Sequence, residues 1–304
     1  MRQQQSKPAG GEKLVLVLGA GFMGTGIAQV CAQAGYRVHL YDVKPEALQR
    51  ALEGMAVSLN KLAAKGRLKE PPAEVLARVQ TVNTLESAAQ ACWVIEAALE
   101  IESLKKELFA ALDRLAPLDT PLSSNTSSIP ISRLAAATQH PERVLGTHFF
   151  GPVPLMGLVE VIRADKTSDE MFERGVALVH SLGKTPVRVR RDIPCFVMNR
   201  IFSAAFREAA DLVAAGVVSP EDVDIGMKLG YGWNAGPFEI ADNAGLDTWV
   251  LIAESMRALG EGNLVSNSDL IPKMVAQGRL GRKAGKGFYR YTPDGKRLPW
   301  DKQD

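Results

Sequence analysis

The feature that most constrains the fold is a glycine-rich segment near the start of the chain, Gly19-Ala20-Gly21-Phe22-Met23-Gly24. Before it stands an apolar, β-branched run at residues 13–18, and after it small and apolar residues recur at helical spacing over residues 25–34. This order predicts a strand, a tight turn and a helix. A second short strand at residues 37–41 completes a βαβ unit, and a further helix starts at Pro45.

The three glycines have the spacing G-x-G-x-x-G, which binds the pyrophosphate of a dinucleotide when it joins a strand to a helix. Gly19 permits the turn, Gly21 lets the backbone approach the phosphates, and Gly24 lets the helix pack closely. Amide groups at the start of the helix would then face the phosphates. A tight turn with a purely structural role is the alternative.

Asp42 follows the second predicted strand and stands 23 positions after Gly19, close to the ~20 expected for an acid that binds ribose. Its carboxylate would accept hydrogen bonds from both ribose hydroxyls and would repel a 2′-phosphate. We therefore expect NAD rather than NADP as the cofactor. Lys44, close by in the sequence, is the residue that favours the opposite preference.

Short apolar runs continue to alternate with helical stretches as far as residue 193. The further strands that we predict span residues 79–82, 93–97, 121–124, 144–149, 158–162 and 187–189, with helices at 103–115 and 169–182. Beyond this point the pattern is helical, at residues 196–215, 219–229, 246–259 and 268–276. We expect an α/β fold: a doubly wound Rossmann-type domain at 13–193, then an all-helical domain at 194–304, after a flexible leader at 1–12.

Composition excludes several other classes of protein. The 304 residues carry 36 Lys and Arg against 34 Asp and Glu, so a nucleic-acid partner is not expected. No run of 18 apolar residues occurs and the first 12 residues are polar, so we expect a cytoplasmic protein with no membrane partner. Three separated cysteines without Cys/His ligand spacing predict neither a disulfide framework nor a metal site.

The candidate catalytic residues lie near the middle of the chain. His148 falls at the carboxyl end of a predicted strand, the edge of an open α/β sheet where ligands bind. Glu160, within the next apolar strand, needs a cationic or N–H partner if it is ionised. Turn-forming residues at 151–154 would let the two meet. We expect packing or surface positions for the other histidines, His39, His140 and His180.

A carboxylate that holds one imidazole nitrogen fixes the tautomer and stabilises the imidazolium that forms when the other nitrogen takes a proton. Beside a nicotinamide, such a pair is suited to the oxidation of a secondary alcohol, because the cofactor accepts the hydride and the histidine the proton. From the residues alone, a structural ion pair between two strands is the alternative.

Residues 148–161, HFFGPVPLMGLVEV, resemble the signature of the L-3-hydroxyacyl-CoA dehydrogenase family. Further similar segments follow in order over nearly the whole chain, at 124–128 (SNTSS), 192–200 (DIPCFVMNR), 236–239 (GPFE), 245–248 (GLDT) and 281–289 (GRKAGKGFY). The resemblance implies reversible oxidation of an L-3-hydroxyacyl-CoA with NAD, and we expect a short-chain substrate such as 3-hydroxybutyryl-CoA.

The resemblance also implies roles for individual residues. His148 would be the catalytic base, Glu160 its partner, Ser127 a hydrogen-bond donor to the substrate oxygen, and Asn199 a contact to the acyl group. The implied cofactor-binding residues are Gly19, Gly21, Phe22, Met23, Gly24, Asp42, Ala98, Glu100, Lys105 and Asn125, of which Glu100 and Lys105 would contact the nicotinamide half. The implied substrate-binding residues are Ser58, Lys65, Ser127, Gly151 and Asn199, of which Ser58 and Lys65 would contact coenzyme A.

Three positions depart from the family pattern. The family usually has Asn at the position of Gly151, a basic residue at that of Gly157, and Gly at that of Cys195. Loss of the Asn would remove a polar group beside the reacting carbon, and Cys195 would narrow the acyl site. Neutral drift within a working enzyme is the alternative.

Two other functions stay open. One is a related dehydrogenase of another 3-hydroxy acid, such as a sugar acid, carnitine or a carrier-protein thioester, although those relatives tend to lack the pair Phe149-Phe150. The other is a non-catalytic NAD-binding protein. The joint presence of the implied catalytic residues makes this alternative less favoured: His148, Glu160, Ser127 and Asn199. The family resemblance further implies a homodimer formed through the helical domain, with the substrate cleft beside it.

Overall fold

The computed structural model describes residues 13–299, so the leader expected at residues 1–12 lies outside the described residues. The chain divides between Asp192 and Ile193 into two compact units, which are described separately below. Among the described residues, no helix has both the length and the apolar composition needed to cross a membrane.

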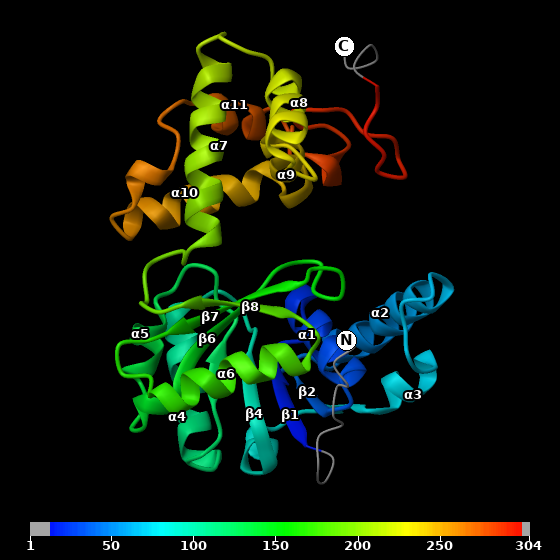
Figure 1. Ribbon diagram of the computed structural model, residues 1–304, viewed down its shortest axis with the longest axis vertical. Coiled ribbons are helices and arrows are strands. Elements are labelled where there is room, and N and C mark those ends of the chain that lie inside the picture. The colour runs from blue at the N-terminus through cyan, green and yellow to red at the C-terminus, as the bar shows by residue number, and fades with distance from the viewer. Residues whose placement is uncertain (1–12, 300–304) are drawn as a thin grey trace, which may run out of the picture. The chain divides into compact units, whose positions relative to one another are not determined.

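The first unit is built on one eight-stranded sheet with the order β3-β2-β1-β4-β5-β6-β7-β8 (Figure 1). Its strands are β1 (Leu14–Leu18), β2 (Arg37–Tyr41), β3 (Val79–Val82), β4 (Ala91–Glu96), β5 (Leu122–Ser124), β6 (Val144–Phe149), β7 (Leu158–Arg163) and β8 (Thr185–Val189). The first six are mutually parallel, whereas β7 is antiparallel to β6 and parallel to β8. The reversal has a simple cause, because the loop at 150–157 is shorter than a parallel crossover requires.

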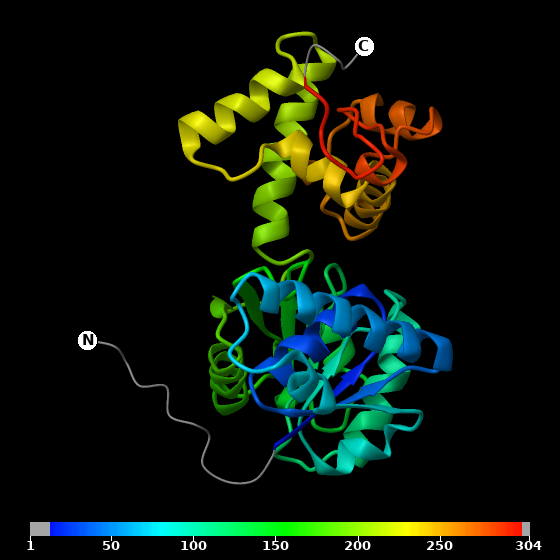
Figure 2. The ribbon, with the colours of Figure 1, turned by 90° about the vertical axis from the view of Figure 1, so that its right-hand side faces the viewer.

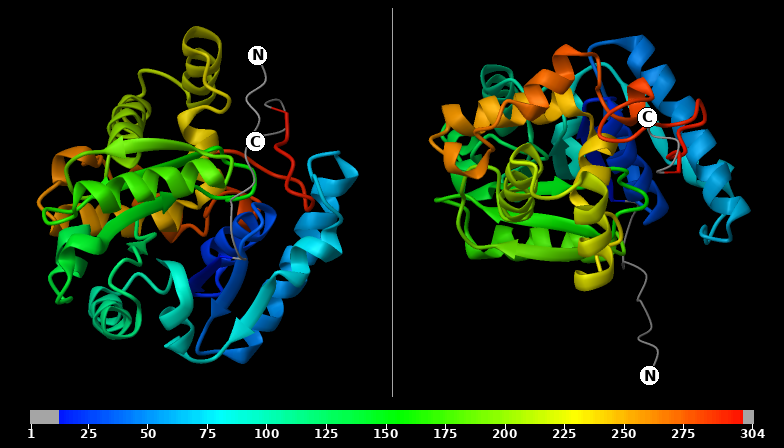
Figure 3. Two further views of the ribbon diagram at one scale, coloured as in Figure 1. Left: turned by 60° about the horizontal axis from the view of Figure 1, so that its bottom comes forward. Right: turned by 90° about the horizontal axis from the view of Figure 1, so that it is seen from above.

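Helices cover both faces of this sheet. They are α1 (Phe22–Gln33), α2 (Pro45–Ala64), α3 (Pro72–Ala77), α4 (Glu102–Leu115), α5 (Ile131–Ala135) and α6 (Asp169–Ser181), with 3-10 turns η1 (Leu85–Gln90) and η2 (Pro141–Arg143). Figure 2 shows α6 and α4 on opposite sides of the strands, and Figures 1 and 3 show α2 extending from the sheet as an arm. The predicted doubly wound, mostly parallel α/β fold is confirmed.

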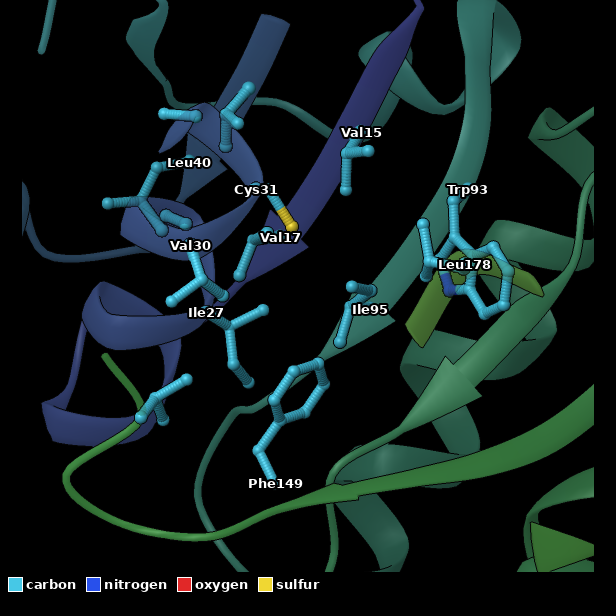
Figure 4. Close-up of a cluster of buried hydrophobic side chains, with 14 of the residues drawn as sticks. Val15, Val17, Ile27, Val30, Cys31, Leu40, Trp93, Ile95, Phe149 and Leu178 are labelled. Atoms are coloured by element: carbon cyan, nitrogen blue, oxygen red, sulfur yellow. The ribbon is translucent and has the colours of Figure 1, made fainter. Parts of the chain in front are cut away.

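The pattern of burial fits the interior position of β1, which is the third strand in the sheet order. All five of its residues are buried, as expected for a parallel strand covered on both faces. Val15 and Val17 point to the face that packs on Ile27 and Val30 of α1 (Figure 4). Because side chains alternate along a strand, the leucines of β1 face the other side. The carboxyl end of β1 therefore leads directly into the glycine-rich turn.

A buried ion pair fixes the start of β6 against the end of α4. The guanidinium of Arg143, which is fully buried, donates to Asp113 Oδ1 from Nε at 3.1 Å and from Nη2 at 2.8 Å. Its Nη1 also donates to the carbonyl oxygen of Ala116, at the C-terminus of α4, at 3.1 Å. This anchor positions the strand that carries His148.

The second unit is helical in the part of the chain that the structure describes, apart from isolated β-bridges between residues 281 and 297. Its helices are α7 (Met198–Ala214), α8 (Pro220–Tyr231), α9 (Pro237–Ala244), α10 (Leu246–Ala258) and α11 (Leu270–Ala276), with 3-10 turns η3 (Gly262–Leu264) and η4 (Arg282–Ala284). The expected all-helical second part is confirmed, although the sequence pattern did not predict the short helix α9.

Two buried carboxylates hold the second unit together. Asp224 of α8 accepts hydrogen bonds from the first amides of α9 and, at 2.7 Å, from the hydroxyl of Tyr289. Asp242 of α9 accepts from the backbone N–H groups of Phe288 and Tyr289, each at 2.9 Å. Burial raises the pKa of both carboxyl groups. These bonds order the glycine-rich segment at 278–291, whose Tyr289 is almost fully buried.

Candidate active site

In the glycine-rich turn after β1, Gly19 and Gly24 must be glycine because a side chain at either position would clash with the protein's own backbone. Gly19 has φ +98°, and a Cβ there would lie 2.3 Å from the carbonyl oxygen of Ala97. A Cβ at Gly24 would lie 1.8 Å from the carbonyl oxygen of Gly19. Gly21 is different, since a Cβ there would meet nothing within 4 Å among the described residues. The open space beside Gly21 is what close approach of a pyrophosphate to the backbone requires.

The start of α1 has the properties of an anion site. Within α1, the first turn carries no acidic residue, and the N-cap Gly21 provides no side-chain cap. The first amide groups of a helix lack intrahelical acceptors and carry the positive end of the helix dipole. These amides are therefore available to phosphate oxygens, and the turn fits a dinucleotide.

A cavity of about 700 Å³ opens beside this turn. Its lining includes the glycine turn, the end of β2 with Asp42 and Lys44, Ala97 and Ala98 after β4, and residues 152–154 between β6 and β7. Asp42 Oδ2 accepts the backbone N–H of Ala20 at 2.8 Å, and Oδ1 accepts that of Lys44 at 2.9 Å. These two bonds hold the carboxylate in the cavity, where ribose hydroxyls could reach its remaining lone pairs.

The two residues expected to contact coenzyme A lie at different places on α2. Ser58 lines the same cavity as the glycine turn. Lys65 caps the C-terminal end of α2, is exposed, and lies outside the lining of that cavity. The first unit thus brings Ser58, but not Lys65, to the nucleotide cavity.

His148 and Glu160 are directly opposite each other in the antiparallel pair β6 and β7. His148 Nδ1 lies 2.7 Å from Glu160 Oε2, and the two residues are 4% and 0% exposed. On the other side of the ring, Nε2 lies 3.1 Å from the hydroxyl oxygen of Ser127, which follows β5. An Nδ1–H donated to Glu160 leaves Nε2 as the basic nitrogen. The sequence placed the histidine and the acid on adjacent strands, and the structure brings them into contact.

Glu100 organises the loop that carries Ser127. Its Oε1 accepts the hydroxyl of Thr126, the backbone N–H of Ser127 at 3.2 Å, and the backbone N–H and hydroxyl of Ser128 at 3.3 and 3.0 Å. Burial favours a raised pKa for Glu100, but the Lys105 ammonium and these hydrogen bonds outweigh it and hold its pKa below the ordinary value. Glu100 is therefore an anion at neutral pH.

Lys105 on α4 is only 1% exposed, and its ammonium points into the protein. Its Nζ lies 2.6 Å from Glu96 Oε1, 3.3 Å from Glu100 Oε2 and 3.3 Å from the carbonyl oxygen of Ala98. These three acceptors match the three N–H donors of the ammonium. The family resemblance implies that Lys105 contacts the nicotinamide half of the cofactor, and in the described structure these three protein acceptors hold its ammonium in place.

Asn125 and Ala98, two further residues that the sequence predicts to bind the cofactor, each make a hydrogen bond at the same edge. The side-chain oxygen of Asn125 accepts the backbone N–H of Phe149, beside His148, at 2.8 Å. The backbone N–H of Ala98 donates to Glu96 Oε1 at 2.7 Å, and Ala98 lines the cavity. Both residues therefore lie at the carboxyl edge of the sheet, where β1, β4, β5 and β6 end.

Phe22 and Gly151 meet above this edge. Phe22 is 70% exposed and lines the cavity. A Cβ at Gly151 would lie 2.6 Å from Phe22 Cε1 and 3.5 Å from the sulfur of Met23. The ring and the sulfur thus border the space that a side chain at position 151 would enter. A Cβ at Gly157 meets no described atom within 4 Å, so a larger residue would fit there.

The two residues of interest in the second unit lie at its start. Asn199 is in the first turn of α7. Cys195 and Phe196 have φ values of +62° and +51°, a left-handed conformation that glycine adopts without strain. The Cys195 side chain is buried with Met256 and Val265. It therefore packs inside the second unit.

The other histidines lie elsewhere. His39 on β2 pairs with the hydroxyl of Ser87 at 2.7 Å, and His180 is exposed on α6. Nδ1 of His140 lies 3.4 Å from Asp113. None of these three adjoins the glycine turn or the Ser127 loop in the described structure.

Glu96 is the acid that the sequence interpretation missed. It ends β4 after the apolar residues Trp93, Val94 and Ile95, is fully buried, and accepts bonds from Lys105, Ala98 and Ser124. The signal was available, since an acid at the end of an apolar strand needs a partner for the same reason as Glu160.

A dinucleotide-binding fold with a Ser–His–Glu chain at the same sheet edge defines an NAD-dependent oxidoreductase. Residues 14–193 match the NAD binding domain of 3-hydroxyacyl-CoA dehydrogenase, and residues 196–291 match its C-terminal domain. The chain therefore belongs to the 3-hydroxyacyl-CoA dehydrogenase family. The NAD cofactor and the dehydrogenase class predicted from the sequence are confirmed.

Named relatives agree with this assignment. The chain is 45% identical over 281 residues to a probable 3-hydroxybutyryl-CoA dehydrogenase of Bacillus subtilis, covering 92% of this chain and 97% of the relative. It is 41% identical to human mitochondrial hydroxyacyl-coenzyme A dehydrogenase, covering 92% and 91%. The crystal structure of (S)-3-hydroxybutyryl-CoA dehydrogenase PaaH1 from Ralstonia eutropha is similar with a TM-score of 0.85 and 40% identity, covering 93% and 100%.

Proposed function

We propose that the protein oxidises L-3-hydroxyacyl-CoA thioesters to 3-ketoacyl-CoA reversibly, with short acyl chains such as 3-hydroxybutyryl-CoA preferred. The observation that carries the proposal is the chain of contacts from Ser127 through His148 to Glu160. Residues 152–154, which join the two strands of this pair, also line the cavity beside the glycine turn. The acid–base group and the nucleotide cavity thus share one loop.

The residues of the chain provide the proton transfer. Bound NAD supplies the hydride acceptor. Nε2 of His148 takes the proton of the substrate hydroxyl, and the Glu160 carboxylate, 2.7 Å from Nδ1, stabilises the imidazolium that results. The hydroxyl of Ser127, 3.1 Å from Nε2, is placed to bond the same substrate oxygen. In the reverse direction His148 returns the proton to the carbonyl oxygen.

Contacts to the rest of the ligands follow from position and resemblance. Asp42 would hold the ribose, and the turn of Gly19, Gly21, Phe22, Met23 and Gly24 the pyrophosphate. Ala98, Glu100, Lys105 and Asn125 would border the nicotinamide half, and Ser58 and Lys65 would contact coenzyme A. Asn199 would contact the acyl group, a role that rests on the family resemblance alone. Gly151 would border the reacting carbon without supplying a polar group.

The preference for a short acyl chain rests on the relatives. The Bacillus subtilis and Ralstonia eutropha proteins carry the name 3-hydroxybutyryl-CoA dehydrogenase and match this chain at 45% and 40% identity. Both matches cover more than nine-tenths of each chain. The most economical assignment is therefore the same four-carbon substrate class.

We also propose that the protein is a homodimer formed through its second unit. Large apolar side chains are exposed there, among them Leu229 at 84% and Tyr231 at 79%, close together at the end of α8. Exposed apolar groups at one place are typical of a surface that a partner covers. Light scattering should give twice the monomer mass, and an active species at the monomer mass would contradict this.

The substrate assignment is tested by NADH oxidation with 3-ketoacyl-CoA thioesters of increasing chain length, beside the matching free acids. We expect the highest kcat/KM with acetoacetyl-CoA and little turnover of the free acids. Higher kcat/KM with long acyl chains would overturn the short-chain preference. Turnover of free 3-keto acids in preference to thioesters would favour a dehydrogenase of another 3-hydroxy acid.

A further inference from the structure

Lys184 is a buried lysine whose ammonium binds the backbone of a distant segment. The residue is 8% exposed, and its Nζ donates to the carbonyl oxygen of Val153 at 2.7 Å and to that of Met156 at 2.6 Å. In the part of the chain that the structure describes, no carboxylate pairs with this ammonium. Burial lowers the pKa of Lys184, because the charged form is the one that loses hydration. The two carbonyl oxygens take the place of an acid, so the backbone that carries them is tied to Lys184.

The backbone at Lys184 is itself fixed by the end of α6. Gly183, with φ +71°, ends the helix in a left-handed conformation, and its N–H donates to the carbonyl oxygen of His180 at 2.9 Å. The N–H of Lys184 donates to the carbonyl oxygen of Val179 at 3.2 Å, and β8 begins at the next residue. The lysine side chain therefore starts from a well-anchored junction between a helix and a strand.

The backbone that Lys184 binds is the turn at residues 152–156, in the connection between β6 and β7. The N–H groups of Leu155 and Met156 donate to the carbonyl oxygen of Pro152 at 2.9 and 3.1 Å, which closes the turn from within. The ammonium binds two further carbonyl oxygens of the same turn from the protein side. Without the ammonium, these two oxygens would lose a donor and the turn would depend on its own hydrogen bonds.

The 152–156 turn connects the two halves of the proposed site. On one side, Val153 packs closely on α1, because a Cβ added at Gly26 would lie 2.8 Å from Val153 Cβ. Residues 152–154 also line the cavity beside the glycine turn. On the other side, the turn follows β6, which carries His148. The position of the turn therefore affects how the cavity wall is placed relative to His148.

We propose that Lys184 is a positioning residue for the reaction, which acts by holding the 152–156 turn against α1. The proposal rests on the proposed function for its kinetic consequence. Lys184 is absent from the lining of the nucleotide cavity, whereas residues 152–154 are part of it. The lysine therefore acts on the bound ligands through this turn. Its loss lets the turn move away from Gly26 and misplaces the cavity wall relative to His148.

The test compares Lys184→Met with Lys166→Met. Methionine is similar to lysine in length but has no N–H donor, so Lys184→Met removes the two hydrogen bonds to the turn. Lys166 is exposed in the connection between β7 and α6, so its loss removes a lysine from the surface. At saturating NADH and acetoacetyl-CoA, we expect Lys184→Met to lower kcat at least tenfold and Lys166→Met to change it less than twofold. A folded Lys184→Met protein with parental kcat would overturn the proposal.

Hydrogen–deuterium exchange in the cofactor-free protein gives a readout that is independent of turnover. The amides of Leu155 and Met156, which close the turn, should exchange at least tenfold faster in Lys184→Met than in the parent or in Lys166→Met. Faster exchange in β1 with unchanged exchange in the turn would show that Lys184 contributes only to global stability, and would contradict the positioning role. A parent without dehydrogenase activity would reject the proposed function, and the exchange result would still decide this role.

Gly26→Ala tests the same claim from the opposite side of the turn, and it decides the matter if Lys184→Met does not fold. The added methyl group lies 2.8 Å from Val153 Cβ and pushes the turn away from α1 while Lys184 is retained. The matched control is Gly226→Ala on α8, where a Cβ meets nothing within 4 Å among the described residues.

We expect Gly26→Ala to lower kcat at least fivefold and to speed the exchange of the Leu155 and Met156 amides, and Gly226→Ala to change neither. Parental exchange of these two amides in Gly26→Ala would contradict the proposal.

Discussion

The ring of Phe22 lies against the backbone of Gly151, so that a Cβ at position 151 would be 2.6 Å from Phe22 Cε1. This contact joins the pyrophosphate turn to the loop that follows His148. It also explains how the chain accommodates its departure from the family pattern, because Phe22 and Met23 border the space in which the family usually has an Asn side chain. The ring is 70% exposed and can turn away.

Gly151→Asn should therefore fold normally and leave the Kd of NADH unchanged. By the family resemblance, the added amide would lie beside the reacting carbon, so it should change kcat/KM for acetoacetyl-CoA several-fold. Steady-state kinetics and NADH fluorescence titration measure the two quantities. The matched control is Gly157→Asn, because a Cβ at position 157 meets open space. This variant should change neither kcat/KM nor the Kd of NADH. An unchanged kcat/KM in Gly151→Asn would show that this position is silent.

Cofactor choice depends on Asp42. Its carboxylate is fixed in the cavity by the amides of Ala20 and Lys44, and we expect NADH to bind at least tenfold more tightly than NADPH. Asp42→Ser removes the charge that repels a 2′-phosphate and leaves Lys44 and Arg50 in the same lining, so the preference should fall. Fluorescence titration with both nucleotides measures it.

Glu46 provides the control for that experiment, because it is an acid in the first turn of α2 that lies outside the cavity lining. Glu46→Ser should retain the preference for NADH. Equal affinities of the parent for NADH and NADPH would refute the assigned role of Asp42.

The buried pair of Arg143 and Asp113 should dominate the stability of the first unit. Arg143→Met leaves Asp113 as a buried carboxylate without its partner and removes the cap on the end of α4, so we expect a loss of about 3–5 kcal/mol. Arg133→Met, which breaks a surface pair with Glu102, should cost less than about 1 kcal/mol. Urea unfolding of both variants measures the difference, and similar losses would contradict the account.

The lowered pKa of Glu100 predicts how stability depends on pH. Because its pKa is lower in the folded protein than the ordinary 4.5, Glu100 stabilises the fold above that pH, and the contribution disappears as the pH falls through the folded value. Glu100→Gln lacks this titration. The difference in unfolding free energy between parent and variant should be largest near neutral pH and shrink below pH 4.5. A difference that is constant down to acid pH would contradict the assigned ion pair with Lys105.

Local signals predicted much of the fold and part of the site. The strand, turn and helix around Gly19 depend on neighbouring residues alone, so their pattern was sufficient. The contact of His148 with Glu160 was predictable because a buried acid needs a partner and the short connection allows few registers. The antiparallel register then places them directly opposite each other.

Features that depend on packing between distant segments were not predictable in this way. Lys105 looks like an ordinary lysine of an amphipathic helix, and only the fold of β4 beneath α4 buries it against Glu96. The short helix α9 depends on Asp224 of the preceding helix to cap its first amides, which no local pattern shows. The contact between Phe22 and Gly151 likewise joins residues far apart in the sequence.

The central claim is that Nε2 of His148 transfers the substrate proton, and His148→Gln tests it most directly. The variant removes the basic nitrogen, so kcat/KM for acetoacetyl-CoA with NADH should fall about 10²–10⁴-fold at neutral pH while the Kd of NADH stays unchanged. His180→Gln, an exposed histidine on α6, should retain parental kinetics. A His148→Gln protein that binds NADH and turns over acetoacetyl-CoA as fast as the parent would contradict the account.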